Sequence, residues 1–257
     1  MDRLIRLTDR LLVVVPGPLR RVLRRPLEPG RSPVADAVAT VVRVTLLLSV
    51  AGFALLAVTH LVDLLALDDR IHAFNADSDD SAWGWASVAV EAGAALLLGL
   101  LAATSARRRA LTACALVVAF LSFDDFLAIH ERVSRLGEHL PVEHAERLVW
   151  PVVWLPVLAV AFVLLWRIAE GGGDAARALV RGGLLALVVA VFLEAASPVL
   201  FAAGEEHGSA GYETEVAVEE GLELAGWIWI AGGLAVTLLL RLGAPEQSGV
   251  LSGRGGR

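Results

Sequence analysis

The sequence predicts an all-α, polytopic membrane protein built as a bundle of six transmembrane helices. Three observations carry this prediction. Of the 257 residues, 56% are hydrophobic, whereas a soluble domain has about 45–50%. The apolar residues form long blocks, and a block of ~20 such residues can span a bilayer as a helix. Arginine-rich and acid-rich links alternate between the blocks, as they do when successive helices cross a membrane in opposite directions.

Residues 1–40 form an arginine-rich segment that precedes the first apolar block. We interpret residues 4–15 as an amphipathic helix that lies on the cytoplasmic leaflet, where basic side chains meet anionic lipid. The alternative is a disordered basic tail.

The six spans follow one another in a single membrane domain, residues 41–241. We expect them at residues 41–66, 83–104, 109–131, 148–168, 176–202 and 214–241. Tryptophans near the ends of several spans fit this placement, because their amphipathic rings favour the membrane interface. Residues 242–257 are rich in Gly, Ser and Arg and predict a disordered cytoplasmic tail.

The charges of the links predict the orientation. Arginines flank the membrane domain and fill the links after the second and fourth spans, whereas acidic residues dominate the first and third links of the other side. Since cytoplasmic loops carry the excess of Arg, both termini are expected in the cytoplasm of a bacterium, with the chain in its inner membrane. The basic residues serve orientation, so the expected partner is membrane lipid and not nucleic acid.

Two residue counts exclude some kinds of chemistry. Cys114 is the one cysteine, which excludes an intrachain disulfide and a thiolate metal cage. The chain contains no lysine, which excludes a Schiff base formed on its own side chain.

Ionisable residues inside the spans are the strongest functional signal, because a mid-membrane Asp costs roughly 2.5–3.5 kcal/mol on insertion scales. They are His60 and Asp63 in the first span, Glu91 in the second, Asp124, Asp125, His130 and Glu131 in the third, Glu194 in the fifth, and Glu215, Glu219, Glu220 and Glu223 in the sixth. The alternating topology places all of them in the extracytoplasmic half of the bilayer. The other half is almost purely Leu, Ala and Val.

Spacing along the helices adds local detail. Asp124 and Glu131 are seven residues apart and are expected on one helical face, whereas Asp125 faces a different neighbour or the lipid boundary. Pro198 lies four residues after Glu194, so it is expected to free the Glu194 carbonyl beside the carboxylate.

Packed carboxylates cannot all be ionised without cations or shared protons. Imidazole combined with carboxylate is a ligand mixture that suits Fe, Mn or Zn. The residues predicted to bind such a metal are His60, Glu91, Asp124, His130, Glu194 and Glu223. The residues predicted to orient these ligands or relay protons are Asp63, Asp125, Glu131, Glu219 and Glu220.

Part of the third span resembles a sequence motif of other membrane proteins. The stretch Leu-Ser-Phe-Asp-Asp-Phe-Leu-Ala-Ile-His-Glu over residues 121–131 resembles an S-x-D-[DE]-x4-H-E motif of uncharacterised bacterial multi-spanning membrane proteins. The resemblance covers one helix. It implies that Asp124, Asp125, His130 and Glu131 act together, and it implies no particular activity.

The first functional hypothesis is therefore a mono- or dinuclear metal site in a membrane enzyme, a hydrolase or oxidoreductase that acts on a lipid-like or small lipophilic substrate. The arrangement of ionisable residues in the sequence assigns no catalytic residue. The alternatives are a proton- or cation-coupled transporter and a non-enzymatic membrane subunit. The apolar inner half and the lack of inverted repeats weigh against a transporter.

Overall fold

We analysed a computed structural model, which describes residues 16–19, 32–67, 70–78, 80–139, 146–202 and 208–243. Six long helices make up most of the described chain. They are α3 (Pro33–Leu67), α4 (Ala82–Ala103), α5 (Arg108–Leu127), α7 (Glu146–Ala169), α8 (Gly173–Ala202) and α9 (Ala210–Leu242). The amphipathic helix predicted at residues 4–15 lies outside the described residues, as does the tail from residue 244 onward.

Each of the six helices contains a stretch that is long and apolar enough to cross a membrane. The prediction of an all-helical protein with six helices able to span a membrane is therefore confirmed for the described residues. The first helix begins at Pro33, eight residues before the predicted start of the first span. The orientation of the termini stays a prediction.

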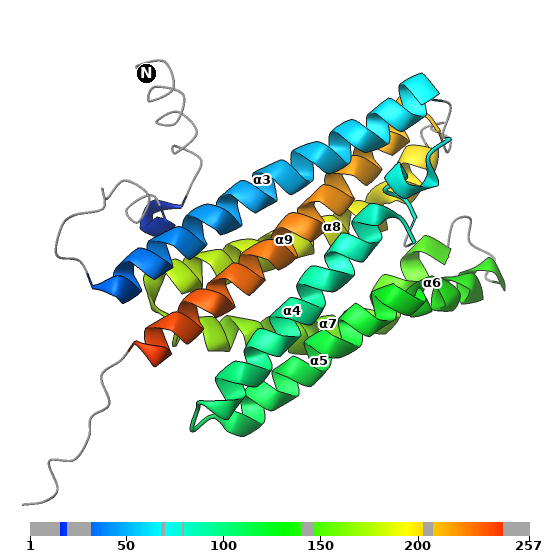
Figure 1. Ribbon diagram of the computed structural model, residues 1–257. Helices are drawn as coiled ribbons and strands as arrows, with labels where there is room; N and C mark the ends of the chain where they lie inside the picture. The colour runs from blue at the N-terminus through cyan, green and yellow to red at the C-terminus, as the bar shows by residue number, and fades with distance from the viewer. Residues whose placement is uncertain are drawn as a thin grey trace, which may run out of the picture.

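The bundle is organised around α9. This helix packs against α3, α4 and α8, and Figure 1 shows it running between α3 and the other helices. The contact of α8 with α9 is close because Gly183 faces Gly226: a Cβ atom on Gly183 would lie 2.5 Å from the Gly226 carbonyl oxygen. Small residues allow such close approach between membrane helices, so α9 can carry its side chains into the centre of the bundle.

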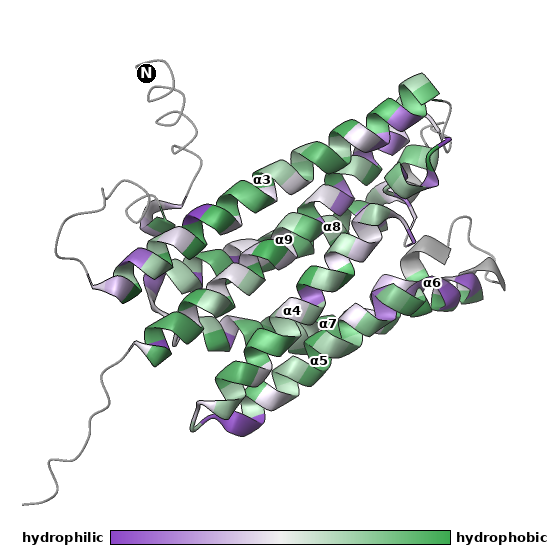
Figure 2. Cartoon of the chain, in the orientation of Figure 1, coloured by the Kyte–Doolittle hydropathy of each residue, from purple (hydrophilic) through white to green (hydrophobic). Residues whose placement is uncertain are grey.

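The two ends of the bundle differ in their packing. At one end lie residues 70–78 and 80–81, which we call the 70–81 segment, and the short helix α6 (Ile129–Ser134). We call this the α6 end (Figure 1). Towards the opposite end the core consists of apolar side chains from α4, α5, α7, α8 and α9, among them Leu98, Cys114, Val118, Leu165 and Leu234. Polar residues inside the helices gather nearer the α6 end (Figure 2).

The predicted third span is broken near its end. The sequence predicted one helix over residues 109–131, but α5 ends at Leu127 and α6 begins at Ile129. Between them Ala128 adopts a left-handed conformation with φ 49° and ψ 46°. This conformation costs a non-glycine residue roughly 1–2 kcal/mol. A hydrogen bond that only the break permits offsets the cost, because the Asp124 carboxylate accepts the His130 backbone N–H at 3.1 Å.

Candidate metal centre

A cavity of about 540 Å³ lies between α4, α5, α7, α8 and α9 towards the α6 end. Its ionisable lining residues are Asp77, Glu91, Asp124, Asp125, His130, Glu131, Arg135, Glu194, Glu219, Glu220 and Glu223. Nine of the eleven residues that the sequence singled out therefore meet in one cavity, although they come from four separate spans and α6. The two that do not meet it are His60 and Asp63.

On α4, Glu91 projects into the protein interior with a relative exposure of 1%. Its Oε2 atom has no hydrogen-bond partner among the described residues, while its carboxyl group interacts with that of Asp125. The Ser122 hydroxyl donates to the Val88 carbonyl at 3.0 Å and so fixes α5 against α4 beside this pair. A buried and a half-buried carboxyl group in contact need a proton or a cation between them.

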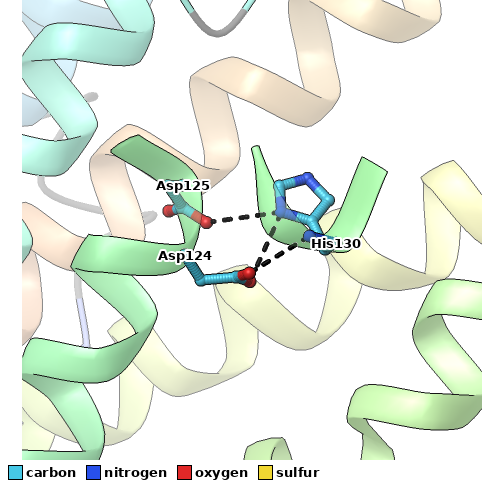
Figure 3. A group of neighbouring side chains, drawn as sticks. All are labelled: Asp124, Asp125 and His130. Carbon is cyan, nitrogen blue, oxygen red and sulfur yellow. Dashed lines mark hydrogen bonds and ion pairs between the residues drawn. The ribbon is translucent and has the colours of Figure 1, made fainter. Parts of the chain in front are cut away.

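The break at Ala128 determines how Asp124, Asp125 and His130 lie (Figure 3). The His130 Nδ1 atom is 3.4 Å from Asp124 Oδ2 and 3.9 Å from Asp125 Oδ1. A continuous helix would turn the His130 ring away from the aspartates, whereas α6 brings it back over them. Asp124 and Glu131 thus no longer share the regular helical face that the sequence predicted, although both line the cavity.

These separations are longer than those of good hydrogen bonds, and the shorter one is compatible with two ligands of one ion. Two atoms that bind one tetrahedral ion at about 2.0 Å lie ~3.3 Å apart, whereas an N–H···O hydrogen bond has its usual length near 2.9 Å. Two groups of possible ligands emerge, and within each the ligand atoms lie within 4.8 Å of one another: Asp124, Asp125 and His130, and Glu91, Asp125 and Glu223. Asp125 belongs to both groups. It therefore faces Glu91 and the cavity, and not the lipid boundary.

Helix α7 contributes two residues that the sequence reasoning missed. The Trp154 indole N–H donates to Asp124 Oδ2 at 2.8 Å, and the Trp150 indole N–H donates to Glu194 Oε1. Both tryptophans line the cavity. Tryptophans near span ends were expected at the membrane interface, but the spacing of four residues, which places Trp150 and Trp154 on one helical face, was a signal that they act together.

The far wall of the cavity is acidic as well. Glu194 on α8 and Glu219, Glu220 and Glu223 on α9 line it. The Ser197 hydroxyl donates to the Glu194 carbonyl at 2.8 Å. This hydrogen bond satisfies a carbonyl that cannot pair with Pro198, as the sequence predicted from the proline four residues on.

His60 and Asp63 hold the segment 70–81 in place. His60 Nδ1 accepts the Ala76 backbone N–H at 3.1 Å, so Nε2 carries the proton and points at Glu213 Oε2, 2.9 Å away. Asp63 accepts the Ile71 backbone N–H at 3.1 Å. Nδ1 thus accepts the Ala76 N–H and Nε2 faces the Glu213 carboxylate, so the His60 ring does not line the main cavity. The structure thus gives His60 a tethering role and does not bring it to the predicted metal ligands.

The fold and the cavity together define the class: a six-span membrane protein with a buried group of carboxylates and a histidine that could hold a metal. The chain belongs to a family described as a domain of unknown function (DUF8692), whose model matches residues 38–237. This match covers α4, α5, α7 and α8 completely and most of α3 and α9. No curated protein and no solved structure shows significant similarity to the chain.

Proposed function

We propose that this protein is a membrane metalloenzyme with a dinuclear centre of Fe, Mn or Zn in the cavity. The observation that carries the proposal is the position of Asp125, which belongs to both groups of possible ligands. A carboxylate has two oxygens and can bridge two ions. His130 and Asp124 would complete one ion's ligands, and Glu91 and Glu223 the other's. The histidine-containing site suits a transition metal.

The unpartnered Glu91 oxygen supports the same assignment. A buried carboxylate oxygen without a donor costs about 1–3 kcal/mol or more, and no described residue supplies that donor. A cation bound between Glu91 and Asp125 removes both the unsatisfied oxygen and the repulsion between the two carboxylates.

The size of the cavity favours an enzyme over a purely structural metal site. Its volume of about 540 Å³ falls within the range of small-molecule sites, about 300–1,000 Å³. Two ions with a few waters, at about 30 Å³ per water, leave most of it available. Apolar side chains of Leu121, Leu158, Leu187 and Trp227 line part of it, which suits a lipid-like substrate.

Two reaction classes fit these residues. A bound metal would supply either an activated hydroxide for hydrolysis or a redox centre for oxidation. In both cases protons must leave the centre, and Glu194, Glu219 and Glu220 on the opposite wall are placed to accept them. Arg135 is the one arginine among the lining residues described, and it would orient an anionic part of the substrate.

A cation-coupled transporter is the alternative from another class. It needs a polar route to the opposite end of the bundle. The described core beyond Leu121 and Trp227 consists instead mainly of packed apolar side chains, including Leu98, Val118 and Leu234, and the buried Thr45, Ser49 and Thr237 there are uncharged. This packing disfavours transport and supports a reaction that takes place from one side. A non-enzymatic subunit would not need a cavity of this size.

The test is metal analysis of the protein purified in mild detergent without added chelator. We expect about two equivalents of a transition metal in the wild type and less than half of that in Asp125→Asn, because both ions lose a shared ligand. The matched control is Asp174→Asn, since Asp174 lies at the opposite end and contacts Arg177. A wild-type content below about half an equivalent would contradict the proposal.

A further inference from the structure

A second pocket, of about 400 Å³, lies beside the main cavity. It is formed by the start of α4, the end of α5, α6 and the segment 70–81. Three of its lining residues, Asp77, Val88 and Glu131, also line the main cavity. The second pocket therefore adjoins the candidate metal centre from the side of α4 and α5.

One wall of the second pocket is aromatic and open to the lipid. Trp85 and Phe126 contact each other edge to face, with ring centroids 5.5 Å apart and planes at 83°. Their relative exposures are 57% and 51%, although both residues lie on membrane-spanning helices. Since they are near the helix ends, they lie at the depth where tryptophan favours the membrane interface. An acyl chain can lie against this wall.

The other wall is charged, with more acids than bases. Asp77, Asp80 and Glu131 line it together with Arg132. Asp80 accepts hydrogen bonds from the Ser78 hydroxyl and the His72 ring, each at 2.6 Å. The Ser78 hydrogen bond above all, followed by that from His72, lowers the pKa of Asp80, so this carboxylate stays negative at neutral pH. Such a wall complements a headgroup that carries an ammonium and one phosphate.

We propose that the second pocket binds a zwitterionic aminophospholipid. Its ammonium contacts Asp77 and Glu131, its phosphate contacts Arg132, and its acyl chains extend along Trp85 and Phe126. Binding of this lipid does not depend on the metal. A bound lipid lies next to the main cavity, so the same pocket serves as the substrate entrance, and this second role rests on the proposed function.

The test measures lipid binding to the purified protein by native mass spectrometry, with phosphatidylethanolamine and phosphatidylglycerol offered in equal amounts. We expect phosphatidylethanolamine to be retained preferentially. Arg132→Gln should lower its retention about threefold, as loss of an exposed charge contact does, whereas Arg108→Gln at the opposite end should not. Trp85→Ala should lower it about tenfold through lost apolar contact, compared with Phe192→Ala on the lipid-facing side of α8, where Phe192 is 69% exposed.

Two further measurements separate the outcomes. Soluble glycerophosphoethanolamine should not displace the lipid, because it lacks the acyl chains; displacement would assign the pocket to the free headgroup and overturn the lipid proposal. Equal retention of both lipids, or equal effects of the Arg132 and Arg108 substitutions, would also overturn it. Chelated protein should bind the lipid as well as untreated protein does. Failure of the metal analysis would thus leave the lipid result standing. Failure of the lipid-binding test would likewise leave the result of the metal analysis standing.

Discussion

Asp124 accepts hydrogen bonds from two neighbouring residues in the cavity. It accepts the His130 backbone N–H at 3.1 Å and the Trp154 indole N–H at 2.8 Å. Donors of this kind fix the orientation of a carboxylate, and comparable partners of metal ligands are worth about 10–100-fold in metal affinity. If the proposed metal centre is present, the indole on α7 would act on it through Asp124, although the indole carries no charge.

Trp154→Phe removes the N–H and keeps most of the ring. We expect metal affinity to fall about tenfold, while the protein still folds, because the aromatic packing remains. Metal titration of the chelated protein checks this. Trp166→Phe is the control, since Trp166 lies at the opposite end of α7 under Arg181 and should leave metal affinity unchanged. Equal affinities for the two variants would show that the indole N–H does not act on the centre.

At the residue scale, the sequence could predict which side chains lie at the cavity, while their role as metal ligands stays a prediction. Glu91, Asp124, Glu194 and Glu223 could be predicted because a charge inside an apolar helix is costly without a use. His60 could not be assigned, because the two groups that engage its ring, the Ala76 N–H and the Glu213 carboxylate, lie in distant segments whose positions only the fold reveals. The role of Trp154 was hidden because tryptophan near a span end has an ordinary interfacial explanation.

At the scale of elements, the break between α5 and α6 decides the geometry of the site. No glycine or proline marks it, and helical periodicity favours a continuous span, so the sequence could not predict it. The break follows from two local contacts: the Ala128 N–H ends α5 on the Asp125 carbonyl at 3.2 Å, and the Asp124 carboxylate accepts the His130 N–H at the start of α6. By contrast, the existence of the six long helices could be predicted from apolar block length alone.

Ala128→Gly tests this account, because glycine adopts a left-handed conformation without the Cβ penalty. We expect the free energy of unfolding to rise by about 1 kcal/mol with metal affinity unchanged. Ala128→Val should lower stability and weaken metal binding together, since a β-branched residue disfavours this conformation and shifts His130. Thermal unfolding in detergent and metal titration provide the two readouts. If glycine were destabilising, the left-handed conformation of Ala128 would be contradicted.

At the scale of the whole molecule, the orientation across the membrane follows from the positions of the arginines. The described α4–α5 link holds Arg107 and Arg108, whereas the 70–81 segment at the α6 end holds Asp77 and Asp80. The positive-inside rule therefore predicts that the α6 end and the cavity face the extracytoplasmic side, with both termini in the cytoplasm.

Cysteine labelling tests this orientation. The native Cys114 can stay in place, because it is buried. Ala73 and Ala106 are both exposed and lie at opposite ends of the bundle. In intact cells, a membrane-impermeant maleimide should label Ala73→Cys and should not label Ala106→Cys. After the cells are permeabilised, both should react. The reverse pattern in intact cells would place the α6 end in the cytoplasm.

The apolar packing around Leu98, Val118 and Leu234 has a consequence for the cell as well as for the site. If the proposed chemistry takes up and releases protons in the cavity, a cavity open at both ends would dissipate an ion gradient across the membrane. The packed half of the bundle acts as an electrical insulator beneath the cavity. Acid–base chemistry can then proceed within the depth of the membrane while the stored energy of the ion gradient is preserved.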